Sequence, residues 1–180
     1  MSSITPPSSP PSPTMSMGSI HGGRPALPDC PLQEQPPRRL RVMIVDDNSI
    51  NLAILSRMLE CNFADTVHLT AVMSSGPAAL ERLCIDNVDL ILMDIDMPVL
   101  TGIQTTEAIR HSASTEYLIL EQNRKVPIIA VTTSDSPAEQ EIYRQVGMAD
   151  CVSKPIALPK LRLAIEQAVG LPSTSELATG

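Results

Sequence analysis

Three aspartates in this chain stand at the ends of apolar runs. Together they could bind a divalent cation. Asp46 and Asp47 come directly after the run Val42–Val45. Asp94 comes directly after the run Leu90–Met93. A short apolar run in an acidic chain is typical of a buried parallel strand. Because ligands of open α/β sheets bind outside the carboxyl ends of the strands, we expect the three carboxylates to share one site.

Carboxylates gathered in this way repel one another, and a cation would remove the repulsion. Two unit charges about 4 Å apart interact by roughly 4 kcal/mol at an effective dielectric of about 20. Three unscreened carboxylates therefore either hold protons or bind a cation. An all-oxygen site with few protein ligands suits Mg²⁺, which keeps several waters and takes a phosphate oxygen as a further ligand. Mg²⁺ is the cation that this cluster predicts.

Two further strand ends carry side chains that suit the transfer of a phosphoryl group. The apolar run 127–131 leads to Thr132, whose hydroxyl can bond a phosphoryl oxygen, and a short strand at 150–153 leads to Lys154. A carboxylate is a weak nucleophile, but it accepts a phosphoryl group when a metal and a lysine neutralise the transition state. Each residue alone could be a turn residue, a surface charge or a helix cap. The order acid pair, acid, hydroxyl and lysine makes the set specific.

The elements that would position these side chains alternate along the chain. From Arg41 onward, strand-like runs alternate with helical patterns, and five strands with five helices result. This alternation predicts an α/β fold, a flavodoxin-like, doubly wound (βα)5 domain whose five-stranded parallel sheet has the order 2-1-3-4-5. Its crossovers should be right-handed.

The first predicted helix begins at an N-cap, Asn48 or Ser49, and carries one apolar stripe. The stripe is of the kind that an amphipathic helix turns toward a core. Its members are Ile50, Ala53, Ile54, Met58 and Cys61.

The chain divides into three parts by composition. Residues 1–37 hold ten of the seventeen prolines, so we expect 1–40 to be a disordered Pro/Ser-rich extension. Residues 41–170 form the predicted domain, with 112–125 as a surface insertion, and 171–180 form a flexible tail. Some pairs in the extension resemble proline-directed kinase sites or simply accompany such a tail: Thr5-Pro6, Ser9-Pro10 and Ser12-Pro13.

The charge and the cysteines exclude several classes of protein. A net charge of −7 and an isoelectric point near 4.9 argue against nucleic-acid binding, and the basic cluster Arg38–Arg41 fits a solvated domain boundary. The four cysteines and three histidines are scattered, which argues against a zinc site or a disulfide framework. No run reaches bilayer length and no signal segment opens the chain. We expect no membrane partner and an intracellular location, in the cytoplasm or also in the nucleus.

Residues 41–170 resemble a response-regulator receiver domain, the phosphoacceptor of two-component and phosphorelay signalling. The matching stretches are Val45–Asn48, Leu92–Pro98, Ile129–Thr132, Gly147–Asp150 and Ser153–Pro155. The Pro/Ser-rich extension and the long insertion make the chain more similar to fungal-type, stand-alone receivers than to minimal bacterial ones.

The resemblance implies a role for each candidate residue. The phosphoryl group would come from a phosphohistidine of a histidine kinase or a histidine phosphotransfer protein. The residues that would touch it are Asp94, as the acceptor, Thr132 and Lys154. The residues that would hold Mg²⁺ are Asp46, Asp47 and Asp94, helped by the backbone carbonyl of Asp96.

The function implied is that of a single-domain response regulator in a phosphorelay, with a stress signal as the expected stimulus. Such a protein assists its own phosphorylation and dephosphorylation, but it is not a conventional turnover enzyme. We expect no second domain after Gly170, so the output would be a contact with a downstream protein effector.

Some positions depart from the family pattern or deserve separate mention. Where the family usually has an aromatic residue on the fifth strand, three residues before the lysine, this chain has Cys151. We therefore expect a muted conformational response around the fourth helix and fifth strand.

Thr101 replaces the acidic residue common before Gly102, which we interpret as a change in helix capping. Asp96 adds a negative side chain where attacking water must come, and Lys154–Pro155 should be a cis bond.

Two alternative functions remain. A haloacid-dehalogenase-type phosphatase uses an Asp-x-Asp pair, which Asp94-Ile95-Asp96 resembles, but such enzymes place their metal-binding acids after the lysine. A non-catalytic receiver-like interaction module would fit Cys151 and the lack of an output domain. A labile acyl phosphate on Asp94, formed with Mg²⁺ and a small phosphodonor, would distinguish a response regulator from such a module.

Overall fold

Strands and helices alternate through the chain in the order that the apolar runs predict. The computed structural model describes residues 38–111 and 116–170. In these residues the strands are β1 Leu40–Val45, β2 Val67–Met73, β3 Leu90–Asp94, β4 Ile128–Thr132 and β5 Asp150–Ser153. The α-helices are α1 Ser49–Asn62, α2 Gly76–Leu83, α3 Gly102–Arg110, α4 Pro137–Gln145 and α5 Leu158–Val169, and a 3₁₀ helix, η2, is Glu121–Lys125.

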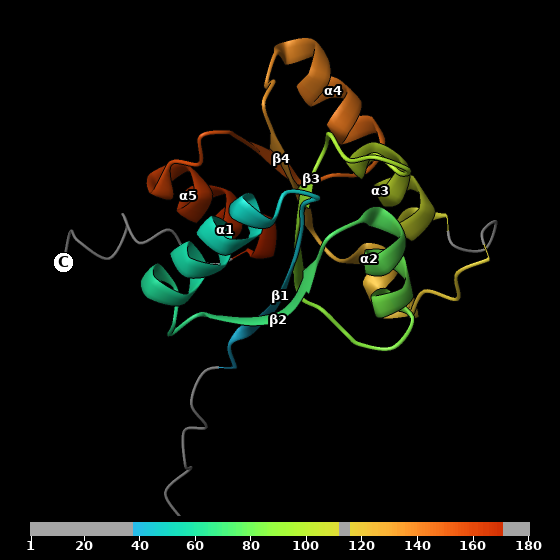
Figure 1. Cartoon of the computed structure of the whole chain (residues 1–180), viewed down its shortest axis with the longest axis horizontal. Coiled ribbons are helices and arrows are strands. Elements are labelled where there is room, and N and C mark those ends of the chain that lie inside the picture. Colours follow the sequence, from blue (N-terminus) through green and yellow to red (C-terminus); the bar gives the residue numbers. More distant parts are fainter. Residues whose placement is uncertain (1–37, 112–115, 171–180) are drawn as a thin grey trace, which may run out of the picture. The chain divides into compact units, whose positions relative to one another are not determined.

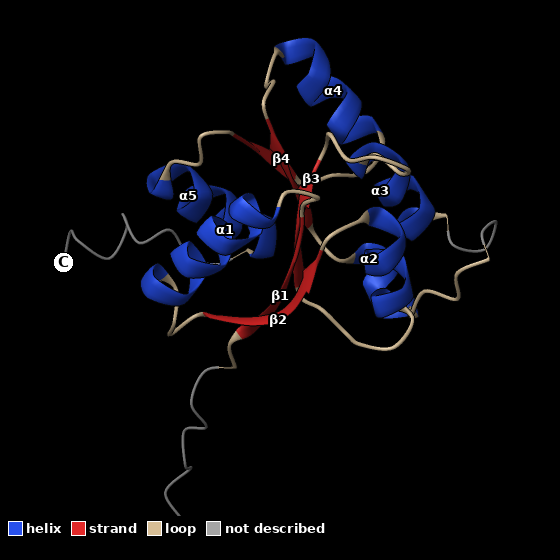
Figure 2. Ribbon diagram, in the orientation of Figure 1, coloured by secondary structure: helices blue, strands red, loops and turns tan. Residues whose placement is uncertain are grey.

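The strands form one parallel sheet in the order β2-β1-β3-β4-β5. The predicted flavodoxin-like order is therefore confirmed. Figure 1 shows α1 and α5 on one side of the sheet and α2 and α3 on the other, and the same two layers of helices are visible in Figure 2. This order places β1 beside β3, so the two strands that end in aspartates are neighbours.

Side chains of the central strands alternate between two apolar layers, one on each face of the sheet. Met43 and Val45 of β1 pack in the layer formed with α2, α3 and α4. Val42 and Ile44 of the same strand pack in the layer formed with α1 and α5. Because both faces are covered, the central strands β3 and β4 are apolar up to their carboxyl ends and lack the alternation of half-exposed strands.

The apolar stripe predicted for α1 is not the buried one. Ile50 is 66% exposed and Ile54 is 54% exposed, so the prediction that this stripe packs on the core is wrong. The helix has apolar side chains on two stripes, and the one with leucines at spacings of three and four faces the sheet. The buried stripe consists of Leu52, Leu55 and Leu59.

The segment before β4 is more than a surface insertion. Asn123, inside η2, is completely buried. Its amide donates to the backbone oxygens of Leu83 at 2.8 Å and Asp86 at 2.7 Å. Its side-chain oxygen accepts from the N–H of Val88 at 3.1 Å. The prediction of a surface insertion is wrong for this part of the segment, because the buried amide ties it to the connection between α2 and β3.

Some of the predicted features lie outside the described residues. They are the extension up to residue 37 with its Ser-Pro and Thr-Pro pairs, residues 112–115 of the insertion, and the tail 171–180. β1 begins at Leu40, next to the predicted start of the domain. Within the described part of the chain, every helix is too short or too polar to cross a membrane.

Candidate functional site

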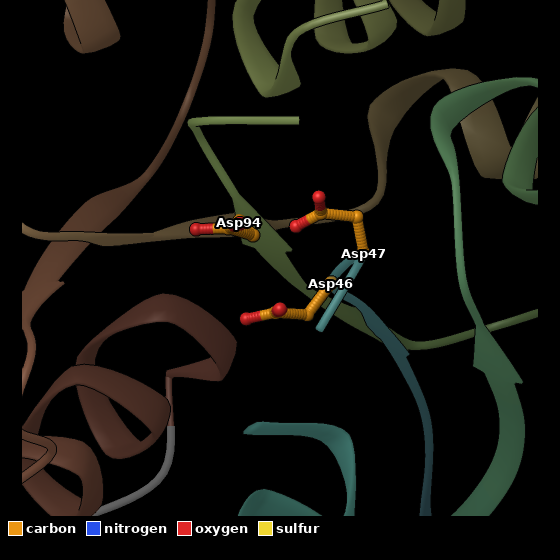
Figure 3. Close-up of side chains that lie close together, drawn as sticks. All are labelled: Asp46, Asp47 and Asp94. Carbon is orange, nitrogen blue, oxygen red and sulfur yellow. The ribbon is translucent and has the colours of Figure 1, made fainter. Parts of the chain in front are cut away.

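The three aspartates of the predicted cation site lie together at the carboxyl edge of the sheet, as Figure 3 shows. Asp46 and Asp47 follow β1, and Asp94 ends β3, the neighbour of β1. One oxygen from each of the three carboxylates lies within 4.8 Å of the other two. Asp46 and Asp94 are buried, whereas Asp47 is exposed. The strand order therefore builds an acidic cluster that solvent reaches at Asp47.

The first turn of α1 holds the carboxylate of Asp46. The N–H of Asn48 donates to Asp46 Oδ1 at 2.9 Å, and the Asn51 amide lies 3.1 Å from each carboxylate oxygen. Asn48 is also the N-cap of α1, because its side chain accepts from the N–H of Ile50. Asn51 was not predicted from the sequence. Its place in the first turn of a capped helix, directly after the acid pair, is the signal that could have found it.

Lys154 supplies positive charge to the site from the position directly after β5. Its Nζ lies 2.7 Å from Asp94 Oδ1 and 2.8 Å from Asp46 Oδ2. Exposure of the side chains is 18% for Lys154, 5% for Asp46 and 4% for Asp94. The bond from Lys154 to Pro155 is cis, as the resemblance implied. Side chains from the ends of β1, β3 and β5 are thus joined in one ion-pair network.

Burial and charge shift the pKa of both partners in this network. Burial raises the pKa of Asp94, and the charge of Asp46 acts in the same direction, against the hydrogen bond and charge of Lys154. Burial lowers the pKa of Lys154, but the bonds to Asp46 and Asp94 outweigh burial, so that its pKa is raised. Lys154 therefore keeps its proton. With Asp47 included, the cluster holds more negative charge than this cation balances.

Thr132 ends β4, one position beyond Val131, the residue that pairs with Asp94. Its backbone oxygen accepts from the N–H of Lys154 at 2.6 Å. Its buried hydroxyl donates to Ser134 O at 2.9 Å and accepts from the Ser134 N–H at 3.1 Å. The sheet thus places this hydroxyl between the strands that carry Asp94 and Lys154.

The acid cluster among the described residues does not include the side chain of Asp96. Its Oδ2 accepts from the hydroxyl of Thr133 at 3.2 Å, so the side chain bridges the loop after β3 and the end of β4. The contribution to a metal site expected of Asp96 is through its backbone carbonyl, and it stays a prediction.

The loop from β3 to α3 passes directly over the end of β3. A Cβ on Gly102 would lie 2.1 Å from the backbone oxygen of Asp94, so a side chain at this position does not fit. Thr101 is the N-cap of α3 and forms a capping box with Gln104. The interpretation of Thr101 as a capping residue is therefore confirmed.

An aromatic hydroxyl reaches Thr132 from α4 rather than from β5. Tyr143 is buried, and its OH lies 3.2 Å from Thr132 Oγ1. Cys151 is half-buried on β5 beside Ala130, and burial raises the pKa of its thiol, which therefore stays protonated. Tyr143 was not predicted from the sequence, where an aromatic residue was expected only on β5. A large side chain on the inner face of α4 is the signal that could have found it.

A doubly wound α/β fold with an acidic, lysine-bearing site at the strand ends defines the class of signal-receiving domains. Residues 42–166 match the family described as response regulator receiver domain. The polar-differentiation response regulator DivK of Brucella ovis is 32% identical over 129 residues, which cover 72% of this chain and 95% of DivK. The chain belongs to the response regulator receiver domain family of two-component signalling, and not to the conventional enzymes.

Two solved structures extend the comparison. The receiver domain of the sensor histidine kinase PA1611 from Pseudomonas aeruginosa PAO1, with a magnesium ion coordinated in its active site cleft, has a TM-score of 0.60 and 29% identity, covering 74% of this chain and 99% of its own. The receiver domain of Saccharomyces cerevisiae Ssk1, in a complex with the histidine phosphotransfer protein Ypd1, has a TM-score of 0.57 and 27% identity. The match covers 72% of this chain and 89% of the Ssk1 chain. Because bacterial and yeast receivers both match, the fungal-type origin stays a prediction.

Proposed function

We propose that this chain is a response regulator that accepts a phosphoryl group on Asp94 from a histidine kinase or a histidine phosphotransfer protein. The observation that carries the proposal is the pair of bonds from Lys154 Nζ to Asp94 and Asp46, at 2.7 and 2.8 Å. These bonds hold a compact cation against the carboxylate that would be the acceptor. Membership of the receiver family supports the same role.

In this proposal the carboxylate of Asp94 is the nucleophile. One of its oxygens bonds to phosphorus while the P–N bond of the phosphohistidine breaks, and the bonding electron pair goes to an imidazole whose other nitrogen carries a proton. The products are an acyl phosphate on Asp94 and a neutral histidine on the donor. Lys154 is close enough to turn its ammonium from the carboxylates to a phosphoryl oxygen, and Thr132 can donate to a second one.

Mg²⁺ fits the acid cluster, where Asp46, Asp47 and Asp94 would hold it, with the backbone carbonyl of Asp96 as a further ligand. The donors are all oxygen atoms, which this cation prefers, and exposed Asp47 gives access from solvent. The PA1611 receiver, 29% identical, is described with a magnesium ion in its active site cleft. A bound ion would neutralise charge on the phosphoryl group during its transfer.

The phosphodonor needs a docking surface beside Asp94, and α1 offers an apolar one. A cavity of about 230 Å³ lies between the site and α1, and its lining includes Asp46, Lys154 and Ile54. Ile54 also lines a groove of about 480 Å³ along α1. We place the donor here, with an apolar surface around its phosphohistidine, because Ile54 lines both the groove along α1 and the cavity beside the site. The Ssk1 receiver, 27% identical, forms a complex with the phosphotransfer protein Ypd1.

Incubation with Mg²⁺ and acetyl phosphate tests the chemistry. We expect a labile acyl phosphate on Asp94, detected as a mass increase that hydroxylamine removes. Asp94→Asn protein and chelator-treated wild type should stay unmodified. A wild-type protein that gains no phosphoryl group would favour the alternative, a non-catalytic receiver-like interaction module that binds its partner constitutively.

Docking is tested by comparing two phosphodonors on the variant Ile54→Arg. We expect phosphotransfer from a phosphorylated histidine phosphotransfer protein to fall about tenfold or more relative to loading from acetyl phosphate. Leu163→Arg is the matched control, because Leu163 is a similarly exposed apolar residue on α5. Equal effects of the two variants would rule out the α1 surface.

A pull-down with wild type and Asp94→Asn addresses the downstream partner. It would identify effectors whose binding depends on phosphorylation.

A further inference from the structure

Tyr143 reaches from α4 into the hydrogen bonds at the end of β4. Its hydroxyl lies 3.2 Å from Thr132 Oγ1 and donates to Ser134 O, also at 3.2 Å. The Thr132 hydroxyl donates to the same backbone oxygen at 2.9 Å. Tyr143 is only 4% exposed, and burial raises the pKa of its phenol, so the hydroxyl keeps its proton at neutral pH. Two hydroxyls therefore converge on one carbonyl oxygen.

Each of these hydroxyls has only one proton to donate. The proton of Thr132 is used on Ser134 O, while its oxygen accepts from the Ser134 N–H at 3.1 Å. A phosphoryl group on Asp94 would need the same proton, because its anionic oxygens can only accept hydrogen bonds. If Thr132 turned toward that group, the Ser134 carbonyl would retain the donor from Tyr143.

We propose that Tyr143 is a positioning residue that couples the hydroxyl of Thr132 to α4. This inference rests on the proposed function, because Thr132 turns toward a phosphoryl group only if Asp94 carries one. When Thr132 turns, the phenol of Tyr143 remains as the hydroxyl donor to the Ser134 carbonyl, and the loop from Ser134 to α4 shifts as the bond from Thr132 is lost. The state of Asp94 thereby reaches a helix at the surface through one phenol.

The surroundings of Tyr143 leave room for this change. A cavity of about 80 Å³ adjoins Tyr143, and its lining includes Met148 and Cys151. A thiol is much smaller than an aromatic ring, so Cys151 leaves space on this side. Ile142, next to Tyr143 on α4, is 45% exposed, so a shift of the helix changes the apolar surface offered to a partner. In this proposal α4 shifts when Asp94 is phosphorylated, whereas Cys151 alone led us to expect a muted shift.

The test compares wild type, Tyr143→Phe and a matched control, Tyr117→Phe, which removes the hydroxyl of the other tyrosine. Each full-length protein receives Mg²⁺ and beryllofluoride, which mimics a phosphoryl group on a carboxylate, and amide NMR spectra are recorded. We expect the amides of Ser134 and α4 to shift in wild type and in Tyr117→Phe. In Tyr143→Phe these shifts should fall about threefold or more, because losing one hydrogen bond changes the equilibrium between the two positions of the loop by a factor of about that size. Amides around Asp94 should shift in all three.

Tyrosine fluorescence gives a second measurement that keeps the phenol of Tyr143. The chain has two tyrosines and no tryptophan, so Tyr117→Phe leaves Tyr143 as the single emitter. Its emission should change when beryllofluoride and Mg²⁺ are added. The same protein with Asp94→Asn should show no change, because the carboxylate that would accept the mimic is then gone.

The possible failures are distinguishable. If the amides around Asp94 do not shift in wild type, the site binds no phosphoryl mimic, and both the proposed function and the coupling are overturned. If they shift but the amides of α4 stay unmoved in wild type, only the coupling is overturned. Only the coupling is also overturned if the amide signals of α4 shift equally in wild type and Tyr143→Phe, or if the emission of Tyr143 does not change.

Discussion

Lys154 Nζ lies 2.7 Å from Asp94 Oδ1, a contact that joins the end of β5 to the end of β3. The same ammonium also bonds Asp46 at 2.8 Å, so one cation serves two buried carboxylates. Removing charged groups from water costs several kcal/mol for each ion, and only close partners offset that cost. Stability without metal should therefore depend on the same lysine as the proposed chemistry.

Replacing Lys154 with methionine tests this dependence. In the presence of a chelator, Lys154→Met should lower the free energy of unfolding by about 2–4 kcal/mol, because Asp46 and Asp94 lose their counter-charge. Mg²⁺ should restore part of the loss. Urea unfolding with and without Mg²⁺ measures both effects, and Lys160→Met is the control, since Lys160 makes only a long contact with Ser153 at 3.4 Å. A variant as stable as wild type in chelator would contradict the argument.

Replacing Asp47 with asparagine separates the binding of metal from the ion pairs. Asp47 is the exposed member of the cluster, while Lys154 bonds the other two acids. At ten times its dissociation constant, Mg²⁺ should stabilise wild type by about 1.4 kcal/mol. Asp47→Asn should lose most of this gain, yet melt at a slightly higher temperature in chelator because one repulsive charge is gone. Asp65→Asn, an exposed acid outside the cluster, should behave like wild type in thermal melts.

The site could be predicted from the sequence because its residues occupy strand ends, which is a local property. Apolar runs that stop at Asp46, Asp94 and Thr132, and a short strand that stops at Lys154, place these side chains at one edge of a parallel sheet. The alternation of strands and helices then selects a doubly wound order, which brings β1 and β3 together. Neither step needs knowledge of packing between distant segments.

The features that were missed depend on such packing. Asn123 bonds the backbone of residues 35 to 40 positions earlier, and no local pattern marks it as buried. α1 has two apolar stripes, and only contact with the sheet decides that Leu55 is buried and Ile54 exposed. Tyr143 and Cys151 line one cavity from two different elements, so one position could not reveal the other. Local patterns therefore predicted the positions of the site residues better than the packing around them.

The buried amide of Asn123 should be among the most sensitive polar groups of the fold. Asn123→Ala removes three hydrogen bonds and takes away the side-chain partner of the Val88 N–H and of the Asp86 backbone oxygen. The backbone oxygen of Leu83 keeps a donor, the N–H of Leu120 at 3.2 Å. Each unsatisfied buried group costs about 1–3 kcal/mol, so we expect a loss of about 2–4 kcal/mol in the free energy of unfolding. Gln122→Ala, at the exposed neighbour, should change it by less than about 0.5 kcal/mol. Similar midpoints in urea for both variants would contradict this role.

The pair of Asp89 with Arg41 should make stability depend on pH in a defined direction. Asp89 accepts from Arg41 Nε at 3.0 Å, from Nη2 at 2.9 Å and from the backbone N–H at 2.8 Å. The bonds to the Arg41 side chain, above all, lower the pKa of Asp89 below its ordinary value of 3.8. Because the folded pKa is the lower one, the stabilisation is complete above that ordinary value and is lost as the pH falls through the folded pKa.

The variant Asp89→Asn tests this direction. At neutral pH it should be less stable than wild type by about 1.5–3 kcal/mol, the range for hydrogen bonds to a charged group. The difference should shrink once the pH falls below about 4, where the wild-type carboxylate takes up its proton. Urea unfolding at a series of pH values measures it. Asp86→Asn is the control, because Asp86 pairs with Arg82 at the surface. A difference that stays constant down to low pH would refute the account.

Val99, in the loop between β3 and α3, should be a site where substitution stabilises the protein. Its φ is +70°, a conformation that is strained for a β-branched residue, and its side chain is 87% exposed. Val99→Asn should therefore raise the free energy of unfolding by about 1 kcal/mol, and the melting temperature by about 3–5 °C, because asparagine tolerates this region. Val99→Ala, which removes the branch but keeps a Cβ, should gain less. If alanine stabilised as much as asparagine, lost side-chain bulk and not backbone preference would be the cause, and the proposed backbone strain would be wrong.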